Sequence, residues 1–201
     1  MEPKSLGVPL IFEDQYEFNK EILIPKFRQI ATSTPEFNNY GDTLEVGNAG
    51  STAGNWDKQI HNLPIMEDFT TWALKKAHKI LSYWWHFDFQ AIKINRSWTN
   101  CHKRGGWTNY HVHTHTDLVM AAYVQAPPDS GNLLIIDPLE HHWFGLPTRM
   151  LSKQPPGISY PVSDNKVYFF APFLRHGTEP SQTDEERWVI SFNFSVIRNP
   201  Q

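Results

Sequence analysis

Three histidines and an aspartate alternate along one short segment of the chain. His111, His113, His115 and Asp117 stand two residues apart. Alternate residues of an extended strand share one face, so all four side chains could point the same way. Neutral imidazole ligates Fe, Zn, Cu or Ni, and two imidazoles at this spacing suit one metal ion. The segment is therefore predicted to carry metal ligands; the alternative is a polar strand face exposed to water.

A metal site on this segment needs a further ligand from elsewhere in the chain. His176 follows an apolar run that ends in Ala171-Pro172, and Arg187 opens the last strand-like segment. Two ligands from one strand and one distant histidine leave one face of an octahedral Fe(II) open, as in non-haem iron oxygenases. A 2-oxo acid and O2 fit those open positions. A buried arginine such as Arg187 can pair with the far carboxylate of the 2-oxo acid.

Two pairs of residues compete for the strand's share of the metal site. A hairpin loop needs about two to five residues. His113 leaves room for such a turn before the next strand at Leu118, which favours His111 with His113. If the segment is instead one long strand, His115 and Asp117 become available as the ligand pair. A site without a carboxylate keeps more positive charge and relies on the bound 2-oxo acid for neutralisation.

Polar residues near Arg187 are the predicted lining of a co-substrate pocket. Ser191 and Asn193 alternate with apolar residues on the strand that Arg187 opens, so they share its face. A polar inner face is unusual for a core strand, and a ligand cavity explains it. Tyr123, on the strand after the histidines, is either a hydrogen-bond donor to the same carboxylate or a core aromatic.

The elements that position these residues divide the chain into two regions. We predict one domain, 1–201, because 201 residues is an ordinary domain size. Residues 1–90 are predicted to be a helical and irregular support region. Pro64–Trp85 has the clearest helical spacing, and Pro25 argues against one unbroken helix over Glu13–Ala31.

Residues 91–201 are predicted to form a β core. Pro and Gly clusters separate several short strand-like runs, which are Ala91–Trp98, Leu118–Gln125, Leu133–Ile136, Val167–Phe170 and Arg187–Val196. Short strands after a helix-bearing half are typical of a β-sandwich or barrel supported by helices. Asn95, Asn100 and Trp98 lie close to the first of these strands and either approach the site or pack.

Composition excludes several classes of protein. The net charge of −3 excludes a strongly basic surface for duplex nucleic acid at the whole-chain level. Cys101 is the single cysteine, so no intrachain disulfide forms and a reducing cytoplasm is expected. We expect no secretory leader in the first ten residues and no membrane span, because no run of about 18 apolar residues occurs.

These motifs resemble a family of 2-oxoglutarate/Fe(II) oxygenases common in marine bacteria and cyanophages. The family pattern is H-x-H, a strand, a Pro-rich turn, G-x-L and D-P, then L-x-H and R-x-S-x-S-F-N. The family's L-S-G-V-Y-Y is L-V-M-A-A-Y here, and Val189 replaces the first serine of the last motif. The matching segments are His111-Val112-His113, Gly131-Asn132-Leu133, Asp137-Pro138, Leu174-Arg175-His176 and Arg187-Trp188-Val189-Ile190-Ser191-Phe192-Asn193.

The resemblance implies a fold, a metal and a co-substrate. The fold is a mainly β (α+β) chain with N-terminal helices and a double-stranded β-helix core, jelly-roll or cupin-like. Fe(II) is implied at His111, His113 and His176, with 2-oxoglutarate beside Arg187. Cytoplasmic location follows, in the host cytoplasm if the protein is phage-encoded.

The implied activity is that of a dioxygenase, specifically a hydroxylase. It converts O2 and 2-oxoglutarate into succinate, CO2 and a hydroxylated product, with a protein or peptide side chain as the prime substrate by analogy. Two alternatives stay open. One is a three-histidine cupin-like metalloprotein that does not use 2-oxoglutarate, and the other is a non-enzymatic jelly-roll binding or structural protein. The oligomeric state is not specified by any motif.

Overall fold

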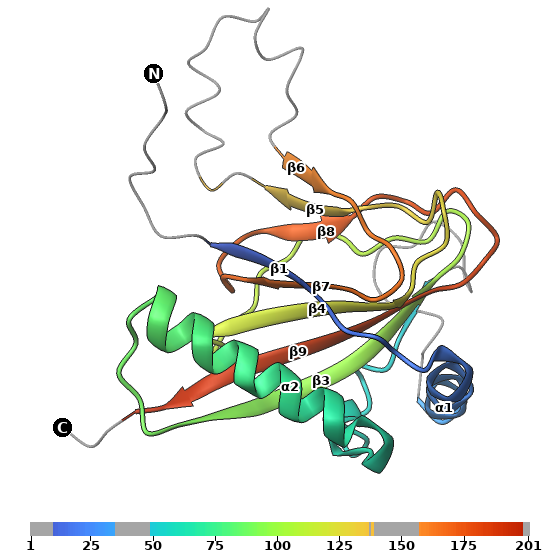
Figure 1. The fold of residues 1–201 in the computed structure, drawn as a ribbon. Coiled ribbons are helices and arrows are strands. Elements are labelled where there is room, and N and C mark those ends of the chain that lie inside the picture. Colours follow the sequence, from blue (N-terminus) through green and yellow to red (C-terminus); the bar gives the residue numbers. More distant parts are fainter. Residues whose placement is uncertain (1–9, 35–48, 137, 139–156, 199–201) are drawn as a thin grey trace, which may run out of the picture.

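Two antiparallel sheets face each other in the protein (Figure 1). The computed structural model describes residues 10–34, 49–136, 138 and 157–198. The larger sheet has the strand order β1-β7-β4-β9-β3-β2, and the smaller has the order β6-β5-β8. The strands are β1 (Ile11–Gln15), β2 (Ala49–Ser51), β3 (Ala91–His102), β4 (Leu118–Gln125), β5 (Leu133–Ile136), β6 (Gly157–Tyr160), β7 (Lys166–Phe170), β8 (His176–Thr178) and β9 (Arg187–Ile197).

The path of the chain between the sheets is that of a jelly roll. β3 and β4 lie in the larger sheet, β5 and β6 in the smaller, β7 in the larger, β8 in the smaller and β9 in the larger. His111 pairs with His176 of β8 through an isolated antiparallel bridge, so the segment before β4 extends the smaller sheet. The predicted mainly β, jelly-roll fold with N-terminal helices is confirmed.

Helices cover the outer face of the larger sheet (Figure 1). They are α1 (Lys20–Thr32), the 3₁₀ turns η2 (Ile60–Asn62) and η3 (Pro64–Met66), α2 (Glu67–His78) and the π-helical turn η4 (Lys79–Trp84). The predicted helix over Pro64–Trp85 is thus three successive helical pieces. No single helix covers Glu13–Ala31, because residues 11–15 form β1, but within the shorter α1 the helix continues through Pro25. Pro25 is exposed, and a row of buried residues on the other side holds the helix to the sheet.

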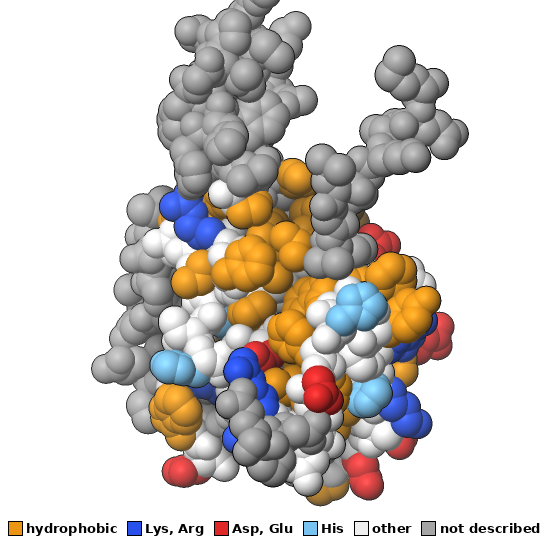
Figure 2. All heavy atoms as spheres, turned by 90° about the vertical axis from the view of Figure 1, so that its left-hand side faces the viewer, with side chains coloured by type: hydrophobic (Ala, Val, Ile, Leu, Met, Phe, Trp, Pro, Cys, Tyr) orange, Lys and Arg blue, Asp and Glu red, His pale blue; other side chains and the backbone are white. Residues whose placement is uncertain are grey.

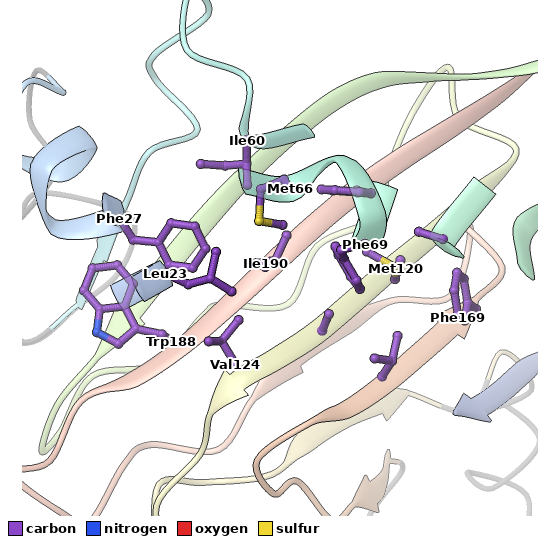
Figure 3. Close-up of a cluster of buried hydrophobic side chains, with 14 of the residues drawn as sticks. Leu23, Phe27, Ile60, Met66, Phe69, Met120, Val124, Phe169, Trp188 and Ile190 are labelled. Carbon is purple, nitrogen blue, oxygen red and sulfur yellow. The ribbon is translucent and has the colours of Figure 1, made fainter. Parts of the chain in front are cut away.

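Hydrophobic side chains between the helices and the sheet form the main core (Figure 3). Phe27 of α1 packs on Trp188 of β9, with ring centroids 6.0 Å apart. Phe69 of α2 lies 5.6 Å from Phe192 by the same measure. Every second residue of β9 faces this core, and the remaining ones face the smaller sheet.

Two strands in the first 90 residues were not predicted. β1 pairs with β7, and β2 pairs with the end of β3, so both lie at edges of the larger sheet. Both are short, and their partners lie far away in sequence, so no local pattern indicates them.

The end of the molecule at which β9 finishes carries a broad area of hydrophobic side chains (Figure 2). Among the described helices, none is long and apolar enough to span a membrane.

Candidate functional site

Three histidines from two segments of the smaller sheet converge on one point. His111, His113 and His176 each offer a ring nitrogen, and these nitrogens all lie within 4.8 Å of one another. Nε2 of His113 and Nε2 of His176 are 3.2 Å apart. The rings of His111 and His176 lie 4.3 Å apart by centroid. The structure therefore groups the three histidines of the favoured register.

Backbone pairing fixes where these rings stand. His111 and His176 exchange both amide hydrogen bonds, at 2.9 and 3.0 Å. The amide of His113 donates to the carbonyl of Pro172 at 3.0 Å. Thr178 Oγ1 accepts a hydrogen bond from the amide of Thr108 at 2.9 Å, so the segment that contains His111 is also bonded to the far end of β8. The cluster is thus built on paired backbone rather than on a free loop.

The hydrogen bonds of two rings select the tautomer that a metal requires. Nδ1 of His111 lies 2.8 Å from the carbonyl of Asn109, and Nδ1 of His176 lies 2.8 Å from the carbonyl of Leu174. A carbonyl only accepts, so both Nδ1 atoms carry the proton. Nε2 of each ring then presents a lone pair to the cluster. Metal-binding histidines in proteins commonly donate their other ring N–H in this way.

The spacing of the cluster fits a divalent metal ion. Ligand nitrogens about 2.1 Å from a metal, at angles between octahedral and tetrahedral, lie about 3.0–3.4 Å apart. The Nε2 atoms of His113 and His176 have this separation. Three imidazoles without a carboxylate suit Fe, Zn, Cu or Ni and give the centre its full positive charge.

Burial keeps two of the three rings neutral. Burial, and then the charge of His111, lower the pKa of His176 to about 3. Burial also lowers the pKa of His113 to about 4, with the same contribution from His111. Metal binding requires the neutral ring, so neither histidine has to lose a proton near neutral pH.

The chain turns at His115, so the alternating residues do not share one face. His115 has a φ of 56°, in the left-handed region, and β4 begins at Leu118. The carbonyl of His115 accepts from Asn95 Nδ2 and from Ser195 Oγ, both at 3.1 Å. Asp117 Oδ2 accepts from the amide of Val196 at 2.8 Å. The prediction that all four side chains could point one way is wrong, and the structure leaves His115 and Asp117 out of the cluster.

A cavity runs from the histidine cluster into the space between the two sheets. All three clustered histidines line it. The opposite wall is the larger sheet, where Trp98 and Asn100 of β3, Ser191 of β9 and Tyr123 of β4 contribute. At the inner end the lining consists of His102, Thr108 and Thr178. The three-histidine cluster thus opens onto a partly polar chamber.

Arg187 lies fully buried behind the inner end of this cavity. Its Nη2 donates to Thr178 Oγ1 at 3.1 Å, and its Nη1 donates to the carbonyls of Ser130 and Gly131. Nε has no hydrogen-bond partner among the described residues. Burial lowers the pKa of the guanidinium. The Gly131 backbone, with a φ of 83°, approaches so closely that a Cβ there would lie 3.1 Å from Arg187 Nη1.

Unpartnered polar atoms in the cavity wall indicate a polar ligand. The hydroxyl of Tyr123 and Oδ1 of Asn100 are buried without a hydrogen-bond partner among the described residues. A buried polar atom without a partner is destabilising by about 1–3 kcal/mol. A small dicarboxylate that enters from the cluster would meet both atoms and the positive charge of Arg187. The residues present therefore fit 2-oxoglutarate as well as a metal.

Of the other predicted site residues, two lie on the cavity face of β9 and one lies outside the described residues. Ser191 lines the cavity, opposite Trp98 in the sheet register. Asn193 is buried on the same face, opposite Arg96. A hydrogen bond with its side chain raises the pKa of His113, against the larger effect of burial. The D-P motif at Asp137 lies outside the described residues.

Sequence reasoning missed three residues at the inner end of the cavity, which are His102, Thr108 and Thr178. His102 is 1 % exposed, and its Nε2 lies 3.0 Å from Thr108 Oγ1. Burial, and then the charge of Arg187, hold its pKa well below the usual value, so it is neutral. The signal that could have identified His102 is the continued alternation of Trp98, Asn100 and His102 beyond the predicted end of the strand.

Comparison with known proteins agrees with this geometry. Residues 96–193 match the family model described as "Putative 2OG-Fe(II) oxygenase". This segment contains all three clustered histidines and Arg187. No curated protein matches the chain.

Solved structures share the fold at low sequence identity. HygX from Streptomyces hygroscopicus, with nickel, 2-oxoglutarate and hygromycin B bound, is 14% identical over 92% of this chain and 82% of its own, with a TM-score of 0.56. AviO1 from Streptomyces viridochromogenes Tue57 is 14% identical over 96% of this chain and 93% of its own, at 0.58. The epimerase SnoN, alpha-ketoglutarate dependent and from nogalamycin biosynthesis, is 12% identical over 94% and 79%, at 0.64.

The family match indicates a class of protein. Residues 96–193 are similar to 2-oxoglutarate/Fe(II) oxygenases, and the activity of that class is that of an oxidoreductase that uses Fe(II) and 2-oxoglutarate. The shared fold of the solved structures agrees with this class.

Proposed function

We propose that the protein is a hydroxylase in which His111, His113 and His176 hold Fe(II) and the inner cavity holds 2-oxoglutarate. The observation that carries the proposal is the continuity of the two parts. The three histidines and the unpartnered atoms of Asn100 and Tyr123 line one cavity. Bound Fe(II) would supply the activation of O2, driven by oxidative decarboxylation of 2-oxoglutarate to succinate and CO2.

The side chains of the cavity then have distinct tasks. Arg187 and the hydroxyl of Thr178, which accepts from it, favour a carboxylate at the inner end. The hydroxyl of Tyr123 donates to the same carboxylate, and Asn100, Ser191 and Asn193 supply further polar contacts along the wall. His102 stays neutral, so it adds no charge beside Arg187.

The finer features of the function belong to the same proposal. The prime substrate is a protein or peptide side chain, and the enzyme works in the cytoplasm, the host's if a phage encodes it. Residues 1–90 support a catalytic core of residues 91–201 within one domain. The helices α1 and α2 support this division, because they cover the outer face of the larger sheet without reaching the cavity lining.

Turnover of 2-oxoglutarate without a prime substrate tests the proposal. Purified protein is loaded with Fe(II) under argon, mixed with 2-oxoglutarate and O2, and assayed for succinate. We expect slow, metal-dependent formation of succinate that a chelator stops. Metal binding without 2-oxoglutarate binding or succinate would instead support a three-histidine metalloprotein of another kind. Absence of metal binding would support a non-enzymatic jelly-roll protein.

A further inference from the structure

The three clustered histidines are not held in the same way. Nδ1 of His111 and Nδ1 of His176 each donate to a backbone carbonyl at 2.8 Å. Among the described residues, no backbone carbonyl accepts from the ring of His113. The orientation of this third ring therefore depends on side chains.

Two flat neighbours fix the plane of the His113 ring but not its rotation within that plane. Trp98 and His176 both lie nearly parallel to it, with centroids 5.8 and 5.0 Å away and planes inclined by 17° and 11°. A ring held only by stacking can turn over about its Cβ–Cγ bond, which exchanges Nε2 with Cε1. Only one of the two orientations presents Nε2 to the cluster, so a further contact is needed to select it.

Asn193 of β9 is placed to make that contact. It follows Ser191 on the cavity face of the strand, and Ser191 is opposite Trp98 in the β3–β9 register. Asn193 is therefore a diagonal neighbour of Trp98, the residue on which His113 stacks. Its side chain is buried and acts as a hydrogen-bond partner of the His113 ring. Its Oδ1 has no well-aligned partner elsewhere among the described residues, so it is available to this ring.

The chemistry of the contact makes Asn193 the acceptor. The contact raises the pKa of His113, against the larger opposite effect of burial. A partner that raises the pKa of a histidine accepts a proton from the ring, which Oδ1 can do and Nδ2 cannot. Nε2 of His113 lies 3.2 Å from Nε2 of His176, inside the cluster. The nitrogen left to donate to Asn193 is therefore Nδ1.

A neutral amide at this position also leaves the charge of the centre unchanged. Three imidazoles do not reduce the charge of a divalent ion, and no carboxylate among the described residues acts on the pKa of His113 or His176. An aspartate in place of Asn193 would be a stronger acceptor and would add negative charge beside the metal. It would hold the metal more tightly and attract a dianionic 2-oxo acid less.

We propose that Asn193 is a positioning residue, whose Oδ1 accepts from Nδ1 of His113 and so holds Nε2 of that ring toward the metal. Its neutral amide at the same time keeps the centre fully positive for the 2-oxo acid. This inference rests on the proposed function, because it takes the three histidines as metal ligands and 2-oxoglutarate as the anion. It assigns to one side chain the task that backbone carbonyls perform for the other two rings.

Nitrogen NMR of the Zn(II)-loaded protein tests the contact itself, without turnover. Zn(II) is diamagnetic and suits three imidazoles. We expect a slowly exchanging Nδ1–H signal from His113 as well as from the buried His176. Asn193→Leu should lose the first signal and keep the second, because His176 donates to the carbonyl of Leu174. A wild-type spectrum without a protected Nδ1–H at His113, or a signal that survives Asn193→Leu, overturns the inference.

Opposite changes in two affinities separate this role from a merely structural one. They are measured by calorimetry with Ni(II) and then with 2-oxoglutarate. Asn193→Leu should lower the affinity for Ni(II) by about 10- to 100-fold. Asn193→Asp should bind Ni(II) at least as tightly as the wild-type protein and 2-oxoglutarate about tenfold more weakly. Asn62→Asp makes the same change of charge at an exposed position outside the cavity lining and should alter neither affinity.

The contradicting results are distinct from failure of the proposed function. Circular dichroism checks that each variant is folded; if Asn193→Leu is not, the wild-type spectrum and Asn193→Asp decide. Unchanged Ni(II) affinity in folded Asn193→Leu, a loss of Ni(II) affinity in Asn193→Asp, or unchanged 2-oxoglutarate affinity in Asn193→Asp overturns the inference. Failure of the wild-type protein to bind Ni(II) and 2-oxoglutarate would instead overturn the proposed function.

Discussion

The two faces of β9 have different roles in the molecule. Trp188, Ile190, Phe192 and Phe194 face the helices and belong to the main hydrophobic core. On the other face, Arg187 is fully buried, and Ser191 and Asn193 are nearly so. The apolar face is packed against its neighbours, whereas the polar face borders a cavity with unpartnered atoms. One face therefore stabilises the fold, and the other is preorganised for ligands.

Removal of a clustered histidine should produce the largest effect, and only on the cavity side. His176→Ala leaves two of three ligands, so affinity for Ni(II) or Fe(II) should fall by about a thousandfold or more. His115→Asn is the matched variant, because asparagine tolerates the left-handed φ of 56° at that position. It should bind metal as the wild-type protein does. The reverse outcome, loss of metal in His115→Asn alone, would support the His115/Asp117 register.

A substitution on the apolar face should change stability and leave ligand binding intact. Phe192→Ala removes a fully buried ring and should lower the free energy of unfolding by about 3–5 kcal/mol, measured in urea. Ile197→Ala, at the exposed end of the same strand, should lower it by less than about 1 kcal/mol. The affinity of the folded Phe192→Ala protein for 2-oxoglutarate should stay within about twofold of wild type. A large loss of affinity would show that the two faces are coupled.

Arg187 distinguishes the co-substrate end of the cavity from its metal end. Arg187→Ala removes the buried cation, so affinity for 2-oxoglutarate should fall by about a hundredfold while metal affinity is retained. Calorimetry with Ni(II) and then with 2-oxoglutarate measures both. Arg104→Ala is the control, because Arg104 is exposed and pairs with Asp184. Unchanged 2-oxoglutarate binding in Arg187→Ala would remove this residue from the co-substrate site.

The buried histidines predict a smaller, pH-dependent effect on the metal-free protein. The pKa values of His113 and His176 are about 4 and about 3 in the fold, below the value of about 6.5 expected for an unfolded chain. Between these values the unfolded chain binds more protons, so stability rises with pH.

Urea unfolding in the presence of a chelator measures this dependence. From pH 6.5 toward pH 4, each histidine should lower stability by at most about 1.4 kcal/mol per pH unit. His176→Gln should make the dependence shallower. A stability that stays flat over this range would contradict the neutral, buried state of these rings.

The sequence predicts the strands with strong local patterns and misses those without them. β4 and β5 have the predicted limits, Leu118–Gln125 and Leu133–Ile136, because each is an apolar run that ends at turn residues. β8 is only His176–Thr178, and long-range pairing with β5 forms it. β3 continues beyond the predicted end at Trp98 because its polar residues face the cavity, which breaks the apolar pattern.

The candidate site was accessible to sequence reasoning where spacing alone decides the outcome. The space needed for a turn before Leu118 favoured His111 and His113, and the turn at His115 agrees with that argument. The inner lining was accessible only in part. The alternation of Trp98, Asn100 and His102 could have placed His102 on the cavity face, but Thr178 lines the same cavity only because β8 faces β3 across it, and no periodicity within β8 indicates this.

A crystal structure of the protein with Fe(II) and 2-oxoglutarate, grown without O2, tests the central claim most directly. The account predicts iron about 2.0–2.2 Å from Nε2 of His111, His113 and His176, with the far carboxylate of 2-oxoglutarate at the Arg187 end of the cavity. Iron bound to His115 and Asp117, or 2-oxoglutarate outside this cavity, would contradict it.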